Sequence, residues 1–511
     1  TVNGRQITYN FSHWSDGGNE NPRTFYTSHD LMITAYMKGH LVSNSVDATA
    51  KNNSRKVVVD NLGNWHSVYE DNGHIYYTYS INNGNTWQPE VRVSEGLNNN
   101  SHPNISTDPS SNVISVLWDS GQEEHHVYWR RKFTNDEWSE IYSNDDLWPM
   151  GAIANTTPVG IGGDPLYILC NHPSIGVNYL ELYIFQNSEL NALAYIQSPN
   201  EMTLNPVISQ ATHSGNMILH IGWEDENQIF YTSYYNGSLG EIEEVTDPDI
   251  GIEINTHPSL SVDLGEHGPH VNVVWSGFDV GLNAYVLLHR QRGANPYTGQ
   301  WGELDEVYYS YSDISNPNLG SFTNEDKPGW FDVAFNFNDE YIRSIQYQVD
   351  RWRWLDFWEN GKYPSFGDQT NEMMLVWTDH TAGLPYLVKH EFFSEGIPED
   401  KNSSGKAMNS NSENIPQPVE KHYRKEIFNL SSLSGLNLSG TVKLTLGDIR
   451  IQTADRSFTW RFIREKDTLN PVRFMQTEPI CVTPDMRSVK FHFQADVSAF
   501  SFQQPLSNQS L

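Results

Sequence analysis

The chain has 511 residues, a net charge of −31, 37% hydrophobic residues and only two cysteines, Cys170 and Cys481. This length predicts roughly two to four domains unless a repeat stretches one of them. The acidity excludes nucleic acid and anionic membranes as partners, because phosphate binding needs Lys and Arg. No run of about 18 apolar residues predicts a membrane span. Two cysteines in separate predicted domains predict neither a disulfide framework nor a metal site.

The negative charge is unevenly distributed along the chain. Residues 421–511 hold 12 Lys and Arg against 8 Asp and Glu, which leaves 20 against 55 for residues 1–420. Such acidity favours solubility in a salty extracellular medium. The chain begins at Thr1 without Met or a signal-peptide pattern, which is typical of a processed or trimmed chain. We therefore expect a secreted, extracellular protein.

Residues 1–54 form the first segment and are rich in Asn and Ser. One good strand pattern lies within them, at residues 31–37. This segment either closes a ring by pairing with its last unit or precedes the fold as a separate lead-in, and the sequence leaves both interpretations open.

A repeat begins near residue 55. Residues 69–78 align with residues 223–232 without a gap. A strand pattern that ends on an aromatic residue, followed by a polar or acidic one, recurs at intervals of about 50 residues or twice that. The aromatic residues are Tyr69, Trp118, Trp223, Trp275 and Trp377. Four-stranded units of this length are typical of β-propellers.

A second marker precedes each of these strand patterns and ends on a Pro. It occurs at Ser101-His102-Pro103, Thr156-Thr157-Pro158, Leu204-Asn205-Pro206, Thr256-His257-Pro258 and Asp326-Lys327-Pro328. We expect each Pro to open a strand, where its missing N–H costs no ladder hydrogen bond. The sequence thus predicts an all-β fold with a six- or seven-bladed β-propeller over residues 55–395. The long interval before Trp377 hides either a further blade around residues 341–350 or an insertion at the Trp-rich residues 351–358.

The end of the chain has a different composition. Residues 396–420 are rich in Asn, Ser and Pro, which is typical of a linker. Residues 421–511 alternate again between apolar and polar side chains, and we interpret them as a small β-sandwich-like C-terminal module.

One tight turn carries a family resemblance. Ser80-Ile81-Asn82-Asn83-Gly84-Asn85-Thr86-Trp87 follows a strand pattern, and its Asn and Gly tolerate positive φ. The segment resembles the Asp-box of sialidase-like β-propellers, with Asn82 where that motif has Asp. The resemblance implies that this turn joins the third and fourth strands of a blade and staples the fold, on the face opposite the functional one. Trp87 is expected to fold back over the turn.

The same resemblance implies a sialidase site only if its arginines are present. Sialidases use three arginines on the substrate carboxylate, an Arg-Ile-Pro start, a Tyr nucleophile with a Glu partner, and an Asp acid. No Arg-Ile-Pro occurs here, and Arg55 is the only arginine at a predicted blade entrance on the functional rim. Without a guanidinium cluster the bidentate clamp on a sugar carboxylate is missing, so we do not expect sialidase activity.

The propeller plan places two sets of loops on one rim. Loops before the first strands contribute Arg55, His102, Thr157, Asn205, His257 and Lys327. Loops after the second strands contribute Glu70, Asp71, Asp119, Glu123, Glu124, His125, His126, His172, Glu224, Asp225, Asp279, Asp379 and His380. Imidazoles and carboxylates are the groups used for acid–base work near neutral pH. The catalytic candidates are His102, His257, Arg55, Glu70 and Glu224, expected to line one pocket, and the binding candidates are His126, His172, Asp119, Asp225 and Asp379.

Three classes of function fit these observations. The first and preferred class is a secreted propeller that binds or recognises a glycan or cell-surface polymer through stacking aromatic residues. The second is a polysaccharide lyase or glycoside hydrolase with a His and carboxylate site on the rim. The third is a structural or adhesive extracellular protein whose C-terminal module binds a protein partner. No cofactor is expected; Ca²⁺ could bind the acidic loops, but no loop motif indicates it.

Overall fold

The structure is a computed structural model. It describes residues 6–16, 18, 20–22, 33–51, 53–95, 99–108, 111–120, 126–144, 148–155, 165–174, 177–200, 203–213, 216–247, 251–265, 268–295, 299–322, 329–348, 351–367, 372–381 and 383–393, together with short strands between residues 427 and 490. This described part contains strands and no helix, so none of it is a helix that could cross a membrane.

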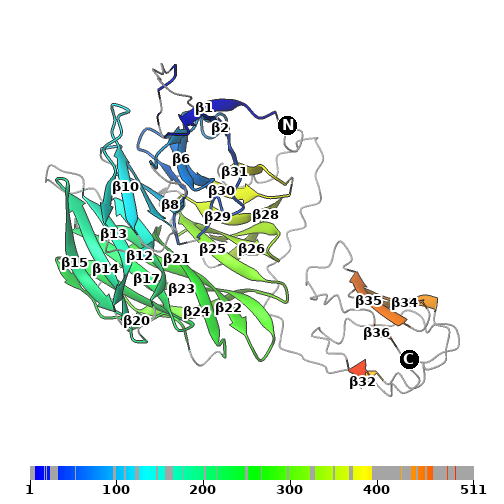
Figure 1. Cartoon of the computed structure of the whole chain (residues 1–511). Coiled ribbons are helices and arrows are strands. Elements are labelled where there is room, and N and C mark those ends of the chain that lie inside the picture. The colour runs from blue at the N-terminus through cyan, green and yellow to red at the C-terminus, as the bar shows by residue number, and fades with distance from the viewer. Residues whose placement is uncertain are drawn as a thin grey trace, which may run out of the picture. The chain divides into compact units, whose positions relative to one another are not determined.

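Seven antiparallel sheets follow one another along the chain and form the blades of a β-propeller (Figure 1). Blade 1 consists of β4 (Val57–Val59), β5 (Trp65–Asp71), β6 (His74–Ser80) and β7 (Val91–Arg92). Blade 2 consists of β8 (Asn100–Thr107), β9 (Ile114–Ser120), β10 (Val127–Lys132) and β11 (Tyr142–Asn144). Blade 3 consists of β12 (Trp148–Asn155), β13 (Leu166–Ser174), β14 (Val177–Gln186) and β15 (Glu189–Gln197).

The remaining blades continue the same order. Blade 4 consists of β16 (Leu204–His213), β17 (Asn216–Asp225) and β18 (Gln228–Tyr235), with β19 (Ser238–Leu239) and β20 (Glu243–Glu244) both paired to β18. Blade 5 consists of β21 (Ile254–Gly265), β22 (Gly268–Asp279), β23 (Ala284–Gly293) and β24 (Trp301–Ser310). Blade 6 consists of β25 (Ile314–Ser321), β26 (Phe331–Phe337), β27 (Tyr341–Gln348) and β28 (Arg351–Asn360). The predicted propeller is confirmed, with seven blades.

Blade 7 takes its strands from both ends of the ring. Three are β29 (Lys362–Phe366), β30 (Met373–Asp379) and β31 (Tyr386–Phe393), and the fourth is β3 (Val42–Ser43), which pairs antiparallel with β31. The core between blades 7 and 1 adds apolar contacts from both, including Trp65, Met374 and Val388. The N-terminal region therefore ties the first blade to the last.

The repeated aromatic residues occupy equivalent places in their blades. Trp118, Trp223, Trp275 and Trp377 lie on the second strands β9, β17, β22 and β30, and all are fully buried. Their indole N–H groups donate to Asn100 Oδ1 (2.9 Å), Ser198 Oγ (2.7 Å), Asn255 Oδ1 (2.8 Å) and the Asn360 carbonyl (3.2 Å). Each ring thus fills the space between neighbouring blades while its polar edge holds the chain segment that enters its own blade.

Three of the five predicted Pro markers, Pro103, Pro206 and Pro258, lie inside first strands at β-bulges, and Pro317 and Pro364 occupy the same place in blades 6 and 7. The register shifts after Ser101, Leu204, Thr256, Ser315 and Lys362. The residue before each Pro has positive φ: His102 (49°), Asn205 (47°), His257 (56°), Asn316 (49°) and Tyr363 (54°). The expectation that each Pro opens a strand is therefore wrong in detail, because the Pro sits where a bulge already removes a ladder bond.

Two of the predicted markers fall elsewhere. Thr157 lies between β12 and β13, and Lys327 lies between β25 and β26, so both follow a first strand instead of preceding one; their own structure is outside the described residues. The long interval before Trp377 contains one whole blade, and the Trp-rich residues 351–358 lie in its outer strand β28.

Short polar side chains just after the bulges link one first strand to the next. Ser259 Oγ accepts from the N–H of Leu319 (3.0 Å), and Asn318 Oδ1 accepts from the N–H of Phe366 (2.8 Å). In the same way, Ser365 Oγ accepts from the N–H of Lys56 (3.0 Å), and Asn104 Oδ1 accepts from the N–H of Arg55 (3.1 Å). First strands of neighbouring blades share no β ladder, so these bonds satisfy backbone groups that face the centre of the ring.

The turn at residues 80–87 connects β6 with β7, as expected. Ser80 Oγ accepts from the N–H of Gly84 (2.9 Å) and Asn82 Oδ1 accepts from the N–H of Thr86 (2.9 Å). Asn83 and Gly84 have positive φ. The half-buried Trp87 ring contacts His390 of blade 7, with ring centroids 4.0 Å apart. The turn therefore supports the seam where the ring closes.

Beyond the propeller, six short strands are described. They are β32 (Ile427–Phe428), β33 (Ser439–Leu444), β34 (Gly447–Ala454), β35 (Ser457–Ile463), β36 (Ile480–Cys481) and β37 (Val489–Lys490). β33 to β36 form one sheet, and β32 pairs with β37. This region belongs to a second compact unit. Its sandwich arrangement and the proposed domain boundaries stay predictions.

Candidate functional site

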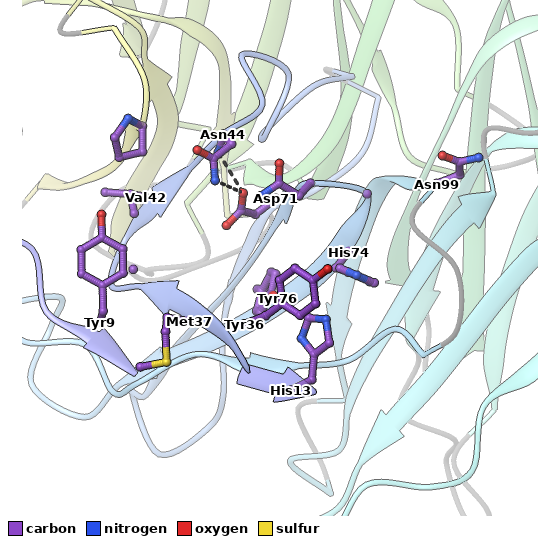
Figure 2. A pocket seen from close by; sticks show the side chains of 14 residues that line it. Tyr9, His13, Tyr36, Met37, Val42, Asn44, Asp71, His74, Tyr76 and Asn99 are labelled. Atoms are coloured by element: carbon purple, nitrogen blue, oxygen red, sulfur yellow. Dashed lines mark hydrogen bonds between the residues drawn. The ribbon is translucent and has the colours of Figure 1, made fainter. Parts of the chain in front are cut away.

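A two-stranded N-terminal ribbon forms one wall of a cavity beside blade 1. The ribbon consists of β1 (Tyr9–Trp14) and β2 (Ala35–Gly39), which pair antiparallel. The cavity has a volume of about 630 Å³ (Figure 2). Its lining residues are Tyr9, His13, Tyr36, Met37, Gly39, Val42, Asn44, Asp71, Asn72, Gly73, His74, Tyr76, Asn99 and Pro385. The loop between β5 and β6 thus forms the opposite wall.

Polar contacts dock the ribbon on blade 1. The Lys38 ammonium is buried and lies 2.8 Å from Asp71 Oδ2, above the rings of Tyr69 and Tyr76. Ser12 Oγ lies 3.1 Å from the Tyr76 hydroxyl. A buried ion pair with aromatic rings around it leaves little freedom for the backbone on either side. These contacts therefore hold the ribbon in place against blade 1.

Aromatic rings and imidazoles gather at one end of the cavity, where Figure 2 shows His13, Tyr36, Tyr76 and His74 together. His13 stacks on Tyr36 with centroids 4.7 Å apart and meets His74 edge-on at 5.2 Å. Burial lowers the pKa of His13 most, and together with the nearby Arg92 and His74 it brings this pKa to about 4. His13 is therefore a neutral imidazole at physiological pH.

The ribbon wall exposes apolar surface. Tyr9 is 53% exposed, Tyr36 46% and Met37 53%. Amides and a carboxylate stand beside them: Asn44 donates to Asp71 Oδ1 from its backbone (2.8 Å) and its side chain (3.0 Å). A concave wall that combines exposed aromatic rings with oriented polar groups is the usual form of a ligand site.

The predicted catalytic candidates do not line this cavity; they lie elsewhere on the rim of the propeller or at the centre of its ring. The Arg55 guanidinium reaches into the centre of the ring, where it donates to Leu260 O (2.8 Å), Asn318 Oδ1 (3.1 Å), Phe366 O (3.4 Å) and Leu319 O, which belong to blades 5, 6 and 7. These contacts assign Arg55 to holding first strands together.

The two histidine candidates pair with different carboxylates. His102 Nδ1 lies 2.8 Å from Asp119 Oδ2, and Ser101 Oγ donates to the other oxygen of Asp119. Glu224 Oε2 accepts from the backbone N–H of His257 (3.0 Å) and from Asn205 Nδ2 (2.9 Å). Glu224 and His257 are thus brought together, and so are His102 and Asp119.

The other candidates are engaged in local structure. Glu70 Oε1 accepts from the N–H of Gly73 (2.6 Å), and burial raises the pKa of its carboxyl group. Asp225 Oδ2 accepts from the N–H of Asn200 (2.8 Å). Asp379 accepts from Thr381 Oγ1 (2.6 Å) and pairs with Lys389 (3.0 Å).

Two binding candidates, His126 and His172, remain; both were predicted in loops after second strands. The carbonyl of His126 accepts from the N–H of Ser120 (3.0 Å), which closes the loop after β9. His172 lies in β13, opposite Tyr179. The cavity beside the ribbon is lined by none of the ten candidates, so in the described part of the chain this site comes from residues that sequence reasoning did not single out, except for Asp71.

The comparisons with known proteins concern the fold. The BP39L lectin from Burkholderia pseudomallei is 13% identical, covering 67% of this chain and 98% of its own, with a TM-score of 0.48. AofleA from Arthrobotrys oligospora is 12% identical, covering 62% of this chain and 88% of its own, with a TM-score of 0.43. The NanB sialidase from Streptococcus pneumoniae is 12% identical, covering 70% of each chain, with a TM-score of 0.37. No family model and no curated protein matches the sequence.

Proposed function

We propose that this protein is an extracellular β-propeller that binds glycans in the cavity between the N-terminal ribbon and blade 1. One observation carries the proposal: Tyr9 and Tyr36 are both about half exposed, yet both line a cavity that also presents amides and a carboxylate. Pyranose rings have an apolar face that packs on an aromatic ring and hydroxyl groups that need donors and acceptors at its edge. The cavity offers both kinds of contact.

The charge of the cavity supports a neutral ligand surface. Asp71 is already paired with Lys38, and His13 is neutral. The charges of Asp71 and Lys38 balance each other, and His13 carries none. The groups left for a ligand are therefore amides, hydroxyls and ring faces. A polyanion such as nucleic acid would instead meet the strong negative charge of residues 1–420.

Binding to a panel of plant and algal polysaccharides and their oligosaccharides tests the proposal. Wild type is compared with Tyr36→Ala and with the control Phe133→Ala, which removes another half-exposed ring. Phe133 lies in the connection of β10 with β11 in blade 2, at the end of the strands opposite to the cavity. Loss of a stacking ring is expected to weaken binding about tenfold, or about 1.4 kcal/mol, whereas the control should bind like wild type. Equal affinity of all three proteins, or no glycan bound at all, would contradict the proposal.

A second candidate function is a polysaccharide lyase or glycoside hydrolase at the same cavity. The observation that favours it is the neutral imidazole of His13 beside the hydroxyl-bearing Tyr36 and Tyr76, because a neutral imidazole accepts a proton and a phenol donates one. Incubation with the same panel, followed by absorbance of unsaturated ends and by reducing sugar, tests this function. Activity that disappears in His13→Ala supports it, and binding without product formation leaves the protein as a glycan binder.

A further inference from the structure

Blade 3 carries a cluster of tyrosines around one carboxylate. Tyr179, Glu181 and Tyr183 alternate along β14, so their side chains share one face of the sheet. Tyr195 of the outer strand β15 lies directly opposite Glu181 in the antiparallel register. Cross-strand partners on one face have neighbouring side chains, so four functional groups are brought together at the edge of this blade.

The carboxylate is covered while the outermost ring is exposed. Glu181 is 3% exposed and Tyr183 9%, whereas Tyr195 is 62% exposed. The rings of Tyr179 and Tyr195 are tilted at 59° with centroids 5.7 Å apart. Hydrogen bonds to Glu181 raise the pKa of Tyr195, and burial together with the same carboxylate raises the pKa of Tyr183. Glu181 is thus the acceptor of phenolic hydroxyls.

This arrangement has the chemistry of a site for an organic cation. The faces of two aromatic rings attract a cation through their quadrupoles, and this attraction grows when a negative group stands behind them. A carboxylate that accepts hydrogen bonds from phenols also attracts a cation placed against the neighbouring rings. Among the described residues no group of three or more His, Cys, Asp or Glu could hold a metal ion, so the cluster does not suit a metal.

We propose that Tyr179, Glu181 and Tyr195 form a second ligand site, on blade 3, which binds the protonated amino group of an amino sugar. The choice of an amino sugar over other organic cations rests on the proposed glycan-binding function. The acidity of residues 1–420, with 20 basic against 55 acidic side chains, raises the local concentration of a cationic glycan around the protein. The site lies on a different blade from the cavity beside the ribbon, so a glycan bound at one does not require the other.

The test compares two oligosaccharides that differ only in charge. The probes are a β-1,4-linked glucosamine tetramer, at a pH where its amines are protonated, and its fully N-acetylated counterpart. Proteins are wild type, Glu181→Gln, Tyr195→Ala and the control Glu189→Gln, which removes an equal charge from an exposed position at the start of β15. We expect the amino tetramer to bind Glu181→Gln about tenfold more weakly than wild type and Tyr195→Ala about threefold to tenfold more weakly. Glu189→Gln should bind like wild type.

Several outcomes would overturn the site. If the amino tetramer binds wild type and Glu181→Gln equally well, the carboxylate does not take part in recognition. If the acetylated tetramer binds wild type as tightly as the amino tetramer does, the positive charge is not recognised. A tetralysine peptide that binds as tightly, and with the same dependence on Glu181, would show a cation site without sugar specificity. Melting temperatures of the variants exclude unfolding, and the exposed Tyr195 gives a variant whose fold is not at stake.

The two proposals fail separately. Tyr36→Ala affects only the cavity beside the ribbon, so loss of neutral glycan binding in that variant with unchanged binding of the amino tetramer supports both sites. If no neutral glycan binds wild type while the amino tetramer still depends on Glu181, the cavity proposal fails and the blade 3 site stands.

Discussion

Replacement of Arg55 by Ala separates a structural role from a ligand-binding one. The guanidinium donates to acceptors of three different blades, at 2.8 Å for Leu260 O and 3.1 Å for Asn318 Oδ1, with a closer contact to Leu319 O. The contact to Phe366 O, at 3.4 Å, is long for a hydrogen bond and adds little. A variant at this position therefore removes about three good charge-assisted bonds at the centre of the ring.

The magnitude follows from those bonds. Each contributes about 1 to 2 kcal/mol net, and removal of the donor leaves half-buried carbonyl groups without their partner. We expect Arg55→Ala to lose about 3 to 5 kcal/mol of stability, which at about 2 °C per kcal/mol for a large domain lowers the melting temperature by about 6 to 10 °C. Arg55→Lys keeps the charge but offers a single point donor, so its loss should be about half as large.

The assay is thermal unfolding followed by intrinsic Trp fluorescence, together with glycan affinity at a temperature where all variants are folded. Arg55→Ala should melt earlier and bind as wild type does. An unchanged melting temperature, within about 1 °C, combined with lost affinity would refute this reasoning and would return Arg55 to the ligand site that the sequence suggested.

The other predictions use the same measurements. Trp87→Ala should cost about 1.5 to 3 kcal/mol, less than the 3 to 5 kcal/mol of a fully buried ring, because Trp87 is only half-buried; a loss near zero would show that its contact with His390 does not support the seam. His220 is fully buried, and burial together with Arg292 lowers its pKa to about 3. Below pH 6.5 the unfolded chain therefore binds a proton at this residue that the folded chain does not bind. Between pH 6.5 and 3 the free energy of unfolding of wild type should fall by up to about 1.4 kcal/mol per pH unit relative to His220→Gln. Equal acid sensitivity of the two proteins would contradict this. His102→Ala and His257→Ala should leave binding in the ribbon cavity unchanged, since neither residue lines it, and weaker binding in both would restore the predicted rim pocket.

The propeller could be predicted because its core repeats in chemistry as well as in place. A Trp on each of four second strands fills the gap between blades, and no smaller residue would bury as much area there. The polar residue after each Trp also recurs. Its role was predicted less well, because a carboxylate such as Glu224 binds the backbone N–H of His257 in the next blade, and a pairing of that kind depends on the assembled ring.

The Pro markers show where a local rule reached its limit. Pro cannot donate a ladder hydrogen bond, so a Pro in a strand pattern fits a strand start, an edge strand or a bulge equally well. The structure has a bulge, with positive φ at His102 and His257, where the rule for residues before Pro predicts extended backbone. Asn316-Pro317 and Tyr363-Pro364 belong to the same series. Asn316-Pro317 repeats the Asn-Pro of Asn205-Pro206, yet the prediction used Lys327-Pro328 instead.

The cavity beside the ribbon could not be predicted from the repeat, because it is built where the repeat is broken. Propeller symmetry directs attention to positions that the blades share, and several of those positions link first strands, as Asn104, Ser259, Asn318 and Ser365 do. The ribbon occurs once in the described part of the chain, and it is followed directly by β3, which pairs with β31 of blade 7. Tyr9, Phe11 and His13 do alternate as an amphipathic strand would, so the signal for β1 is present in the sequence. Its partner β2 overlaps the strand predicted at residues 31–37, but β2 lies about twenty residues further on and its register with β1 includes a bulge, so the pairing of the two strands could not be predicted. The ribbon is thus an addition to one blade of a repeated fold. A ligand site can form there without changing the residues that hold the ring together.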